Sequence, residues 1–312
     1  MKISGFTMGK NVTKLYYPIK ESILSILPIC DEFIVALGNC DEDDKTREEI
    51  LSINSPKIKI IDTVWDIEKY PNGTEMAHQT DIAKSYCTGD WLFSIQTDEV
   101  IHENDLPKIK RRCEELLHDE EIEGILFKFI HFYGDYQHHN DSHGWHKHEI
   151  RIIRNNKDIH SWCDSMSFRR IPNFDGISYR SKNGAYKLKV ALVDATIYHY
   201  SWVRPPEFMQ KKNNAFTKVI KGSSFVPQQN IQYFDYGPLN KLPIFKGSHP
   251  QVMNECIARF NWKDKLQYSG KLKKGRGKQK HEKLKYRFIT FLEKYVFCRP
   301  MWEFKNYILL KR

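Results

Sequence analysis

Short apolar segments alternate with amphipathic segments through the first third of the chain, and this alternation limits the fold more than any other sequence feature. We expect strands at residues 2–7, 32–38, 57–62 and 91–95, with helices at 13–27, 46–51 and 74–86. The segments 32–38 and 91–95 are almost uninterrupted apolar runs, which is typical of strands buried on both faces. This spacing predicts βαβ units and a largely parallel sheet with helices on both faces.

Two of the expected strands lead into acidic residues. Residues 91–95 are followed by Gln96-Thr97-Asp98-Glu99, and residues 32–38 are followed shortly by four acids at 41–44. Parallel strands place their carboxyl ends on one edge, where ligands of open α/β sheets bind, so these acids should meet there. Carboxylates at such an edge hold a hard cation or orient a polar ligand. The structural alternative is an acidic helix N-terminus after residue 97 and a helix-capping turn at 41–44.

The middle of the chain continues with a mixture of strands and helices. We expect strands at 122–133 and 149–154, a strand pair within 187–200, and helices at 107–117 and from about 205 to 221. The last of these begins with Pro205-Pro206, and Pro suits the first helical turn. Five histidines crowd into residues 138–148. Their spacing is irregular and no Cys joins them, so a mobile loop near a polar ligand fits better than a structural zinc site.

The basic character of the chain is concentrated near its C-terminal end. The net charge is +10, and residues 263–287 hold eleven Lys and Arg against Asp264 and Glu282. We expect a folded domain at 1–215, an irregular aromatic and Pro-rich segment at 216–262, and a basic linker with an amphipathic helical tail at 263–312. The helix expected at 283–296 either docks on an anionic membrane surface or packs on the core with a basic face exposed.

Cysteine usage and hydropathy bear on the compartment. The seven cysteines form an odd number without a CxxC pair, which favours reduced thiols over disulfides or a zinc site. No apolar run approaches the length of a membrane span, and the first residues lack the apolar core of a signal peptide. We therefore expect a cytoplasmic protein, which the basic tail would allow to associate peripherally with the inner face of the cell membrane.

Three blocks of sequence carry a resemblance to a known family. They are the strand 33–37 with Asp41 and Asp43, the segment 89–99, and residues 151–154 with Asp164, Phe168, Arg169 and the segment 198–206. In this order they resemble family 2 glycosyltransferases, which have the GT-A fold, and the last block is similar to a bacterial subgroup of surface-polysaccharide assembly. The likeness covers about residues 1–215. It implies an α/β, Rossmann-like fold with a mixed, mainly parallel sheet and flanking helices, here extended by the basic, helical C-terminal part.

The resemblance also implies a reaction and its residues. The expected activity is transfer of a sugar from a nucleotide sugar, UDP-linked, to a hydroxyl of a glycan or lipid-linked acceptor, with inversion and with Mg²⁺ or Mn²⁺ on the leaving diphosphate. Asp98 matches the second Asp of the family's metal motif, Gln96 replaces the first, and His199 is a candidate further ligand. By the resemblance, Asp164 is the general base. The residues that bind the nucleotide sugar are Thr7, Asp41, Asp43, Gln96, Asp98 and Arg204.

Each of these residues also has a structural interpretation. His199 would be a hydrogen-bonded histidine at a strand end, Asp164 a turn residue bonded to a backbone N–H, and Arg204 a surface capping residue. Two other functions also remain open. A nucleotidyltransferase would need a Gly-rich phosphate loop, and residues 5–9 match one poorly. The basic tail would suit a nucleic-acid-binding protein, but its charge lies in one linker, so no nucleic acid is expected as a partner.

Overall fold

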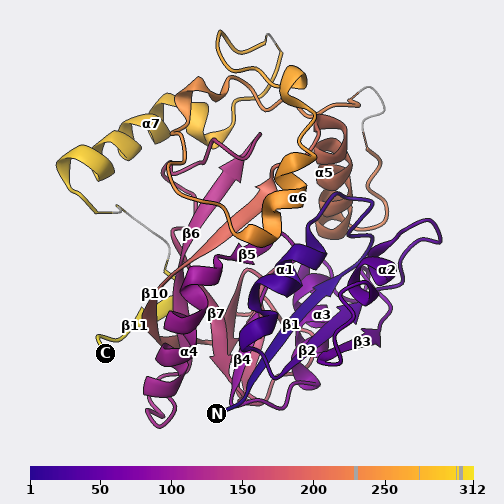
Figure 1. The fold of residues 1–312 in the computed structure, drawn as a ribbon, viewed down its shortest axis with the longest axis vertical. Coiled ribbons are helices and arrows are strands. Elements are labelled where there is room, and N and C mark those ends of the chain that lie inside the picture. Colours follow the sequence, from indigo (N-terminus) through magenta and orange to yellow (C-terminus); the bar gives the residue numbers. More distant parts are fainter. Residues whose placement is uncertain (228–230, 274, 300, 302–304) are drawn as a thin grey trace.

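The expected βαβ alternation is present at the N-terminal end. The structure, a computed structural model, describes residues 1–227, 231–273, 275–299, 301 and 305–312. Four parallel strands lie in the order β3-β2-β1-β4, with helices between successive strands (Figure 1). These elements are β1 (Ile3–Gly9), α1 (Ile19–Ile26), β2 (Glu32–Leu37), α2 (Thr46–Leu51), β3 (Ile58–Asp62), α3 (Thr74–Ser85) and β4 (Trp91–Ser94).

Beyond β4 the sheet becomes mixed. Within the described residues it continues as β4-β7-β6-β10-β9-β8, and β5 and β11 also pair with β10. The β4–β7, β6–β7 and β5–β10 pairs are antiparallel, whereas β6 and β11 run parallel to β10. A mixed sheet with flanking helices is confirmed, but parallel pairing dominates only its N-terminal half. The strands are β5 (Glu99–Ile101), β6 (Gly124–Tyr133), β7 (His148–Arg154), β8 (Ile159–Trp162), β9 (Ser167–Arg170), β10 (Tyr186–Trp202) and β11 (Tyr307–Leu309).

Two local predictions were wrong, and one structural alternative is excluded. The helix expected at 13–27 begins only at Ile19, because Tyr16 has a left-handed backbone (φ 59°) that interrupts the helix and Pro18 then precedes its first turn. The strand pair expected within 187–200 is the single strand β10. Glu99 does not open a helix, since it begins strand β5 opposite His199 on β10.

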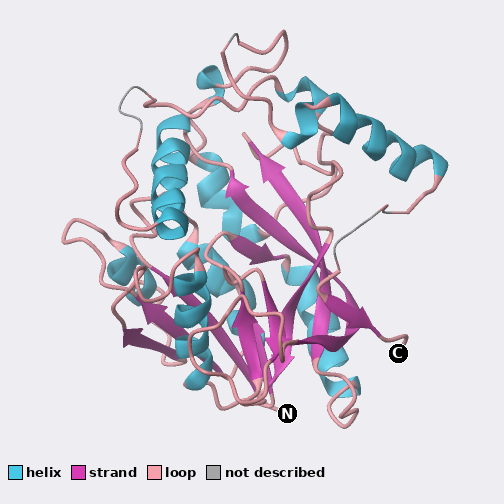
Figure 2. Ribbon diagram, turned by 180° about the vertical axis from the view of Figure 1, so that it is seen from behind, coloured by secondary structure: helices cyan, strands magenta, loops and turns pink. Residues whose placement is uncertain are grey.

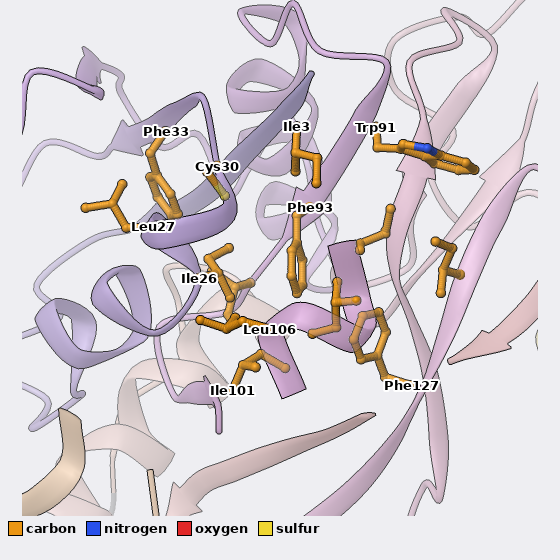
Figure 3. Packing of buried hydrophobic residues seen from close by; sticks show 14 of the residues in the cluster. Ile3, Ile26, Leu27, Cys30, Phe33, Trp91, Phe93, Ile101, Leu106 and Phe127 are labelled. Carbon is orange, nitrogen blue, oxygen red and sulfur yellow. The ribbon is translucent and has the colours of Figure 1, made fainter. Parts of the chain in front are cut away.

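Helices cover both faces of the sheet (Figure 2). Side chains of α1 and α4 (Leu106–Glu115) pack on one face with Phe93 and Phe127, while Ala83 of α3 belongs to the cluster on the other face. Figure 3 shows Ile26, Phe93, Ile101 and Leu106 within the first cluster. Burial on both faces holds the strand ends, and the side chains that follow them, in fixed positions.

The C-terminal third wraps the far end of the sheet and then returns to it. It contains α5 (Pro206–Lys221), α6 (Asn254–Ala258) and α7 (Leu284–Phe291), which continues as a π-helical turn at Leu292–Val296. Short 3₁₀ turns lie at Leu27–Ile29, Glu103–Asp105, Leu239–Lys241, Gln251–Met253, Lys263–Lys265 and Lys280–Glu282. No helix among the described residues is both long and apolar enough to cross a membrane.

The expected division into parts at 1–215, 216–262 and 263–312 stays a prediction. Helix α7 lies within the range 283–296, where a helix was expected, but β11 then pairs with Leu188–Val190 of β10. Some residues of the second and third expected parts lie outside the described residues, namely 228–230, 274, 300 and 302–304.

Candidate active site

Asp98 and His199, far apart in the sequence, meet at the carboxyl edge of the sheet. The chain turns after β4 and pairs Glu99 of β5 with His199 of β10, while the N–H of Tyr200 donates to the carbonyl oxygen of Asp98 at 2.8 Å. The His199 Nε2 atom then lies 3.7 Å from Asp98 Oδ2, and Asp98 is buried. These are the two residues for which the sequence predicted a metal-binding role.

A chain of hydrogen bonds sets the tautomer of His199. His131 Nε2 lies 2.6 Å from the carbonyl oxygen of His146, which only accepts, so His131 carries its proton on Nε2. Its Nδ1 must therefore accept from Nδ1–H of His199, 2.8 Å away. Burial lowers the pKa of both rings and keeps them neutral. His199 Nε2 thus holds a free lone pair on the side of Asp98, the form in which His binds metals.

This pair fits a divalent cation with open coordination positions. Two ligands with bonds of about 2.1 Å to one ion lie at most about 4 Å apart, and the observed separation of 3.7 Å is within that limit. Among the described residues no group of three or more His, Cys, Asp or Glu is placed to hold an ion on its own. A cation here would need ligands from outside the chain, as Mg²⁺ commonly takes them from substrate phosphates and water.

The neighbours of Asp98 in the sequence have structural contacts of their own. Glu99 receives two hydrogen bonds from the guanidinium of Arg151, at 2.6 and 2.7 Å, and both side chains are buried. Gln96 donates its side-chain amide to the carbonyl oxygen of Ser165 at 2.8 Å. Asp98 is therefore the one acid of this strand end whose carboxylate faces the His199 ring.

The turn that carries Asp164 is strained and firmly held. Cys163 and Ser165, the residues on either side, both have left-handed backbones with φ of 60° and 63°. Non-glycine residues in this region cost about 1–3 kcal/mol each and occur preferentially at functional sites. Besides Gln96, Arg151 anchors the turn by donating from Nη1 to the carbonyl oxygen of Met166 at 3.2 Å. Asp164 is thus tied to the strand end that carries Asp98.

Two buried cations lie near Asp98, and the sequence predicted only one of them. Arg204 is fully buried, donates to the carbonyl oxygen of Leu15 at 2.6 Å and stacks on the ring of Tyr17, 4.2 Å from its centre. Its Nε and Nη2 groups have no hydrogen-bond partner among the described residues. Lys212, on α5, donates to the carbonyl oxygen of Ser201 at 3.2 Å. The unpaired, buried N–H groups of Arg204 suit an anion.

The charges of this cluster act on one another. Burial raises the pKa of Asp98, but its pKa is lowered overall, and the positive groups of Lys212 and Arg204 are among the causes, so the carboxylate stays ionised. Burial and the charge of Arg204 lower the pKa of Lys212 to about 7, although Asp98 opposes this. The sequence contained one signal for Lys212: it follows the buried Met209 by three residues, which places both on the inward face of the helix.

The acidic turn after β2 separates into two roles. Asp44 accepts from the N–H of Thr46, the first residue of α2, at 3.0 Å and from Thr13 at 2.7 Å, so it holds the turn to the start of the helix. Asp41 and Asp43 are instead exposed, and both bind the ammonium of Lys14, at 2.7 and 2.6 Å. These contacts lower the pKa of both carboxyls.

A cavity of about 330 Å³ opens beyond the carboxyl ends of β2 and β3. Asp41 lines it together with Gly38, Asn39 and Asp62. Thr7 lies near the end of the adjacent strand β1, and its buried hydroxyl has no hydrogen-bond partner within the described part of the chain. The sheet edge therefore offers the hydroxyl of Thr7, which has no partner among the described residues, and the exposed carboxylate of Asp41, which is bound to Lys14.

The histidine-rich loop (residues 138–148) borders a second cavity, of about 300 Å³. Its walls include His131, Trp145 and His146. Burial lowers the pKa of His146, and the nearby carboxylate of Asp164 acts in the opposite direction. Since His131 is also the hydrogen-bond partner of His199, this cavity adjoins the Asp98–His199 pair.

Comparison with known proteins gives a partial likeness. No known family's sequence profile matches the chain, and no curated protein sequence matches it. Solved structures do. The chain is similar in part to glucosyl-3-phosphoglycerate synthase from Mycobacterium tuberculosis. Against its complex with Mn²⁺, UDP and phosphoglyceric acid, the identity is 20%, the TM-score is 0.29, and 42% of this chain and 43% of that chain are covered.

Two further structures of the synthase match to the same extent. The complex with Mg²⁺ and UDP has 21% identity, a TM-score of 0.29 and coverage of 42% of this chain and 43% of that chain. The complex with Mn²⁺, UDP-glucose and glycerol 3-phosphate has 20% identity, a TM-score of 0.29 and coverage of 42% of this chain and 44% of that chain. The chain thus spans less than half of the length of the synthase. The likeness concerns part of the fold, and the assignment of roles to residues rests on the geometry above.

Proposed function

We propose that the chain is a GT-A-type glycosyltransferase that moves a sugar from a nucleotide sugar, UDP-linked, to an acceptor hydroxyl. The observation that carries this proposal is the Asp98–His199 pair, whose spacing and tautomer suit a divalent cation, beside the two buried cations Arg204 and Lys212. A leaving nucleoside diphosphate gains negative charge as the glycosidic bond breaks, and fixed positive groups stabilise that charge.

The residues of the cluster would share this task. A Mg²⁺ or Mn²⁺ ion held by Asp98 and His199 would supply Lewis-acid stabilisation of the leaving diphosphate. Arg204 has two N–H groups without partners for phosphate oxygens, in the planar geometry that suits such oxygens. Lys212 adds a compact charge from the same side. The nucleoside would occupy the cavity beside Asp41, with Thr7 and Asp43 as further polar contacts and Gln96 holding the strand end.

Asp164 is the proposed general base. Its carboxylate would take the proton of the acceptor hydroxyl while that oxygen forms a bond to the anomeric carbon and the diphosphate leaves from the opposite face, which inverts the configuration. Three observations support this role: the strained turn, its attachment to Gln96, and the cavity beside His146 that would accommodate an acceptor.

The wider role follows the resemblance of the sequence to family 2 enzymes. We propose a glycan or lipid-linked acceptor and a place in surface polysaccharide biosynthesis, with the protein in the cytoplasm and at the inner face of the cell membrane. The loop at 138–148 and the segment 216–262 lie on the acceptor side in this proposal.

Donor hydrolysis and transfer test the proposal directly. The purified chain is incubated with Mn²⁺ and a panel of sugar nucleotides, with release of the nucleoside diphosphate as the readout. We expect turnover with at least one UDP-sugar and its loss on chelation with EDTA. If no sugar nucleotide binds or reacts, and RNA or DNA binds with a steep salt dependence, the nucleic-acid alternative is correct instead.

Asp164→Asn tests the base. Transfer should fall by about a hundredfold or more while donor affinity is kept, since general-base catalysis contributes about 10²–10⁴-fold. Asp175→Asn is the matched control, because Asp175 is an exposed turn residue that accepts from the N–H groups of Ile177 and Ser178. A large loss of donor affinity in Asp164→Asn would contradict the assignment.

A further inference from the structure

Helix α7 has two faces of opposite character. Its inner face is polar and bonded to the histidine-rich loop: the N–H of His143 donates to Thr290 Oγ1 at 2.8 Å, and the His143 ring lies 2.9 Å from a carboxylate oxygen of Glu293. Lys147 binds the other oxygen of Glu293 at 3.4 Å. The carboxylate of Glu293 is buried by these contacts, so the helix is seated on the loop in one orientation.

The outer face of α7 and its π-helical turn is apolar and exposed. Leu284, Phe288, Phe291 and Tyr295 are 75%, 63%, 52% and 72% exposed. They follow one another at intervals of four, three and four residues, which keeps them on one side of a helix with about 3.6 residues per turn. Figure 1 shows α7 at the periphery of the molecule, away from β1–β4. Apolar residues gathered in this way on a soluble surface mark an interaction site.

Basic side chains border this apolar stripe. Lys283, Lys285, Arg287 and Lys294 are exposed and lie between the outer and inner faces. Of these four, Lys294 forms an ion pair with an acid in the described part of the chain, binding Asp141 at 2.5 Å. A stripe of Leu and aromatic residues flanked by Lys and Arg is the composition of helices that lie in the plane of a membrane interface.

We propose that α7 docks in the plane of an anionic lipid bilayer, with Leu284, Phe288, Phe291 and Tyr295 inserted at the headgroup boundary. Charge selects this occupant over a second copy of the chain. Two copies joined through this face would bring their basic borders together, and each copy carries a net charge of +10. Anionic lipids instead attract the same basic residues.

The docked orientation has a consequence for the second cavity. The loop that seats α7 also supplies Trp145 and His146 to the walls of that cavity. The bilayer would therefore lie on the side of the molecule where the acceptor is proposed to bind, which suits a lipid-linked acceptor. This consequence rests on the proposed function, whereas the docking surface does not.

Vesicle co-sedimentation of the full chain tests the docking surface independently of activity. The probes are vesicles of phosphatidylcholine with and without phosphatidylglycerol. We expect binding to the anionic vesicles, weaker binding at high salt, and little binding to phosphatidylcholine alone. Phe288→Ser with Phe291→Ser should weaken binding by about tenfold or more, because the variant loses two aromatic rings that would be buried at the headgroup boundary.

Two further variants test whether the apolar stripe of α7 and its basic border cause the binding to vesicles. Leu51→Ser with Val64→Ser removes apolar side chains that are 62% and 73% exposed elsewhere on the surface, and should bind as the parent does. Lys285→Glu with Arg287→Glu should abolish the preference for anionic vesicles. The proposal is overturned if the parent binds neither kind of vesicle, or if the Phe double variant binds the anionic vesicles as tightly as the parent does. A dimer in gel filtration that this variant dissociates would assign the surface to a second copy instead.

Discussion

The side-chain amide of Gln96 donates to the backbone carbonyl oxygen of Ser165, with 2.8 Å between the two atoms. This bond joins the strand end that carries Asp98 to the turn that carries Asp164. A carbonyl oxygen only accepts, so an ionised Asp or Glu at position 96 would face it without a proton to share. The bond gives a physical reason for Gln at the position where the family motif has its first Asp. The residue holds the proposed base in place.

Gln96→Glu tests this link. The new carboxylate would repel the Ser165 carbonyl, so we expect the turn at 163–166 to shift and kcat to fall by about tenfold or more, since small misplacements of reacting groups are costly. The affinity for the donor should change little. Calorimetric donor binding beside single-turnover transfer separates the two effects. A variant with normal kcat would show that the position of Asp164 does not depend on Gln96.

Asp98 and His199 should act as one unit. We expect Asp98→Asn and His199→Ala each to lose most of the response of turnover to Mn²⁺, and the double variant to be little worse than either single variant. Such non-additivity is typical of groups that share one ligand. The measurement is turnover against Mn²⁺ concentration for the four proteins of the cycle. Independent, additive losses would assign the two residues to separate functions.

Lys212→Met should stabilise the protein while it reduces turnover. The pKa of Lys212 falls from 10.5 to about 7 on folding, so between these pH values the unfolded chain binds a proton that the folded chain does not. The stability of the parent therefore rises with pH through this window, and the cost of the lysine is complete below about pH 7. The variant's advantage in Tm should be largest at pH 7 and below and shrink towards pH 10. A variant that melts lower than the parent at pH 7 would contradict this account.

The buried Glu99–Arg151 pair should be important for stability. Glu99→Ala leaves a buried guanidinium without its carboxylate, which costs about 3–5 kcal/mol in the free energy of unfolding. Glu48→Ala is the matched control, since Glu48 pairs with Lys45 at 3.4 Å on the exposed surface of the protein. Its loss should cost less than about 1 kcal/mol. Urea denaturation of the two variants beside the parent makes the comparison. Equal losses in the free energy of unfolding for Glu99→Ala and Glu48→Ala would mean that the buried pair stabilises the protein no more than an exposed pair does.

The sequence predicted those parts of the fold that local pattern determines. The apolar runs at 32–38 and 91–95 correspond to β2 and β4, because a strand covered on both faces must be apolar throughout. The meeting of Asp98 with His199 was also predictable, but only through the family resemblance. The roles of Gln96 and Glu99 were not, because their partners Ser165 and Arg151 lie more than fifty residues away and only the folded chain brings them close.

Lys212 shows a second limit of prediction from sequence. A lysine in an amphipathic helix is normally exposed, and its neighbours Lys211 and Asn213 support that interpretation. Burial against Ser201 overrides the pattern at this position. The prediction of two strands in place of the single strand β10 was wrong for a related reason. It carries polar and charged residues over seventeen positions, and its pairing with several strands, among them β5, β6 and β11, maintains its length.

The return of β11 to the sheet affects how the C-terminal part can be studied. β11 covers the backbone of Leu188–Val190 on β10. A chain cut before residue 305 would leave the N–H and C=O groups of that edge unpaired, and uncovered edges recruit strands from other molecules. We expect such a shortened protein to self-associate. Its sedimentation with vesicles would then report aggregation, whereas point substitutions on α7 leave the edge covered and report lipid binding alone.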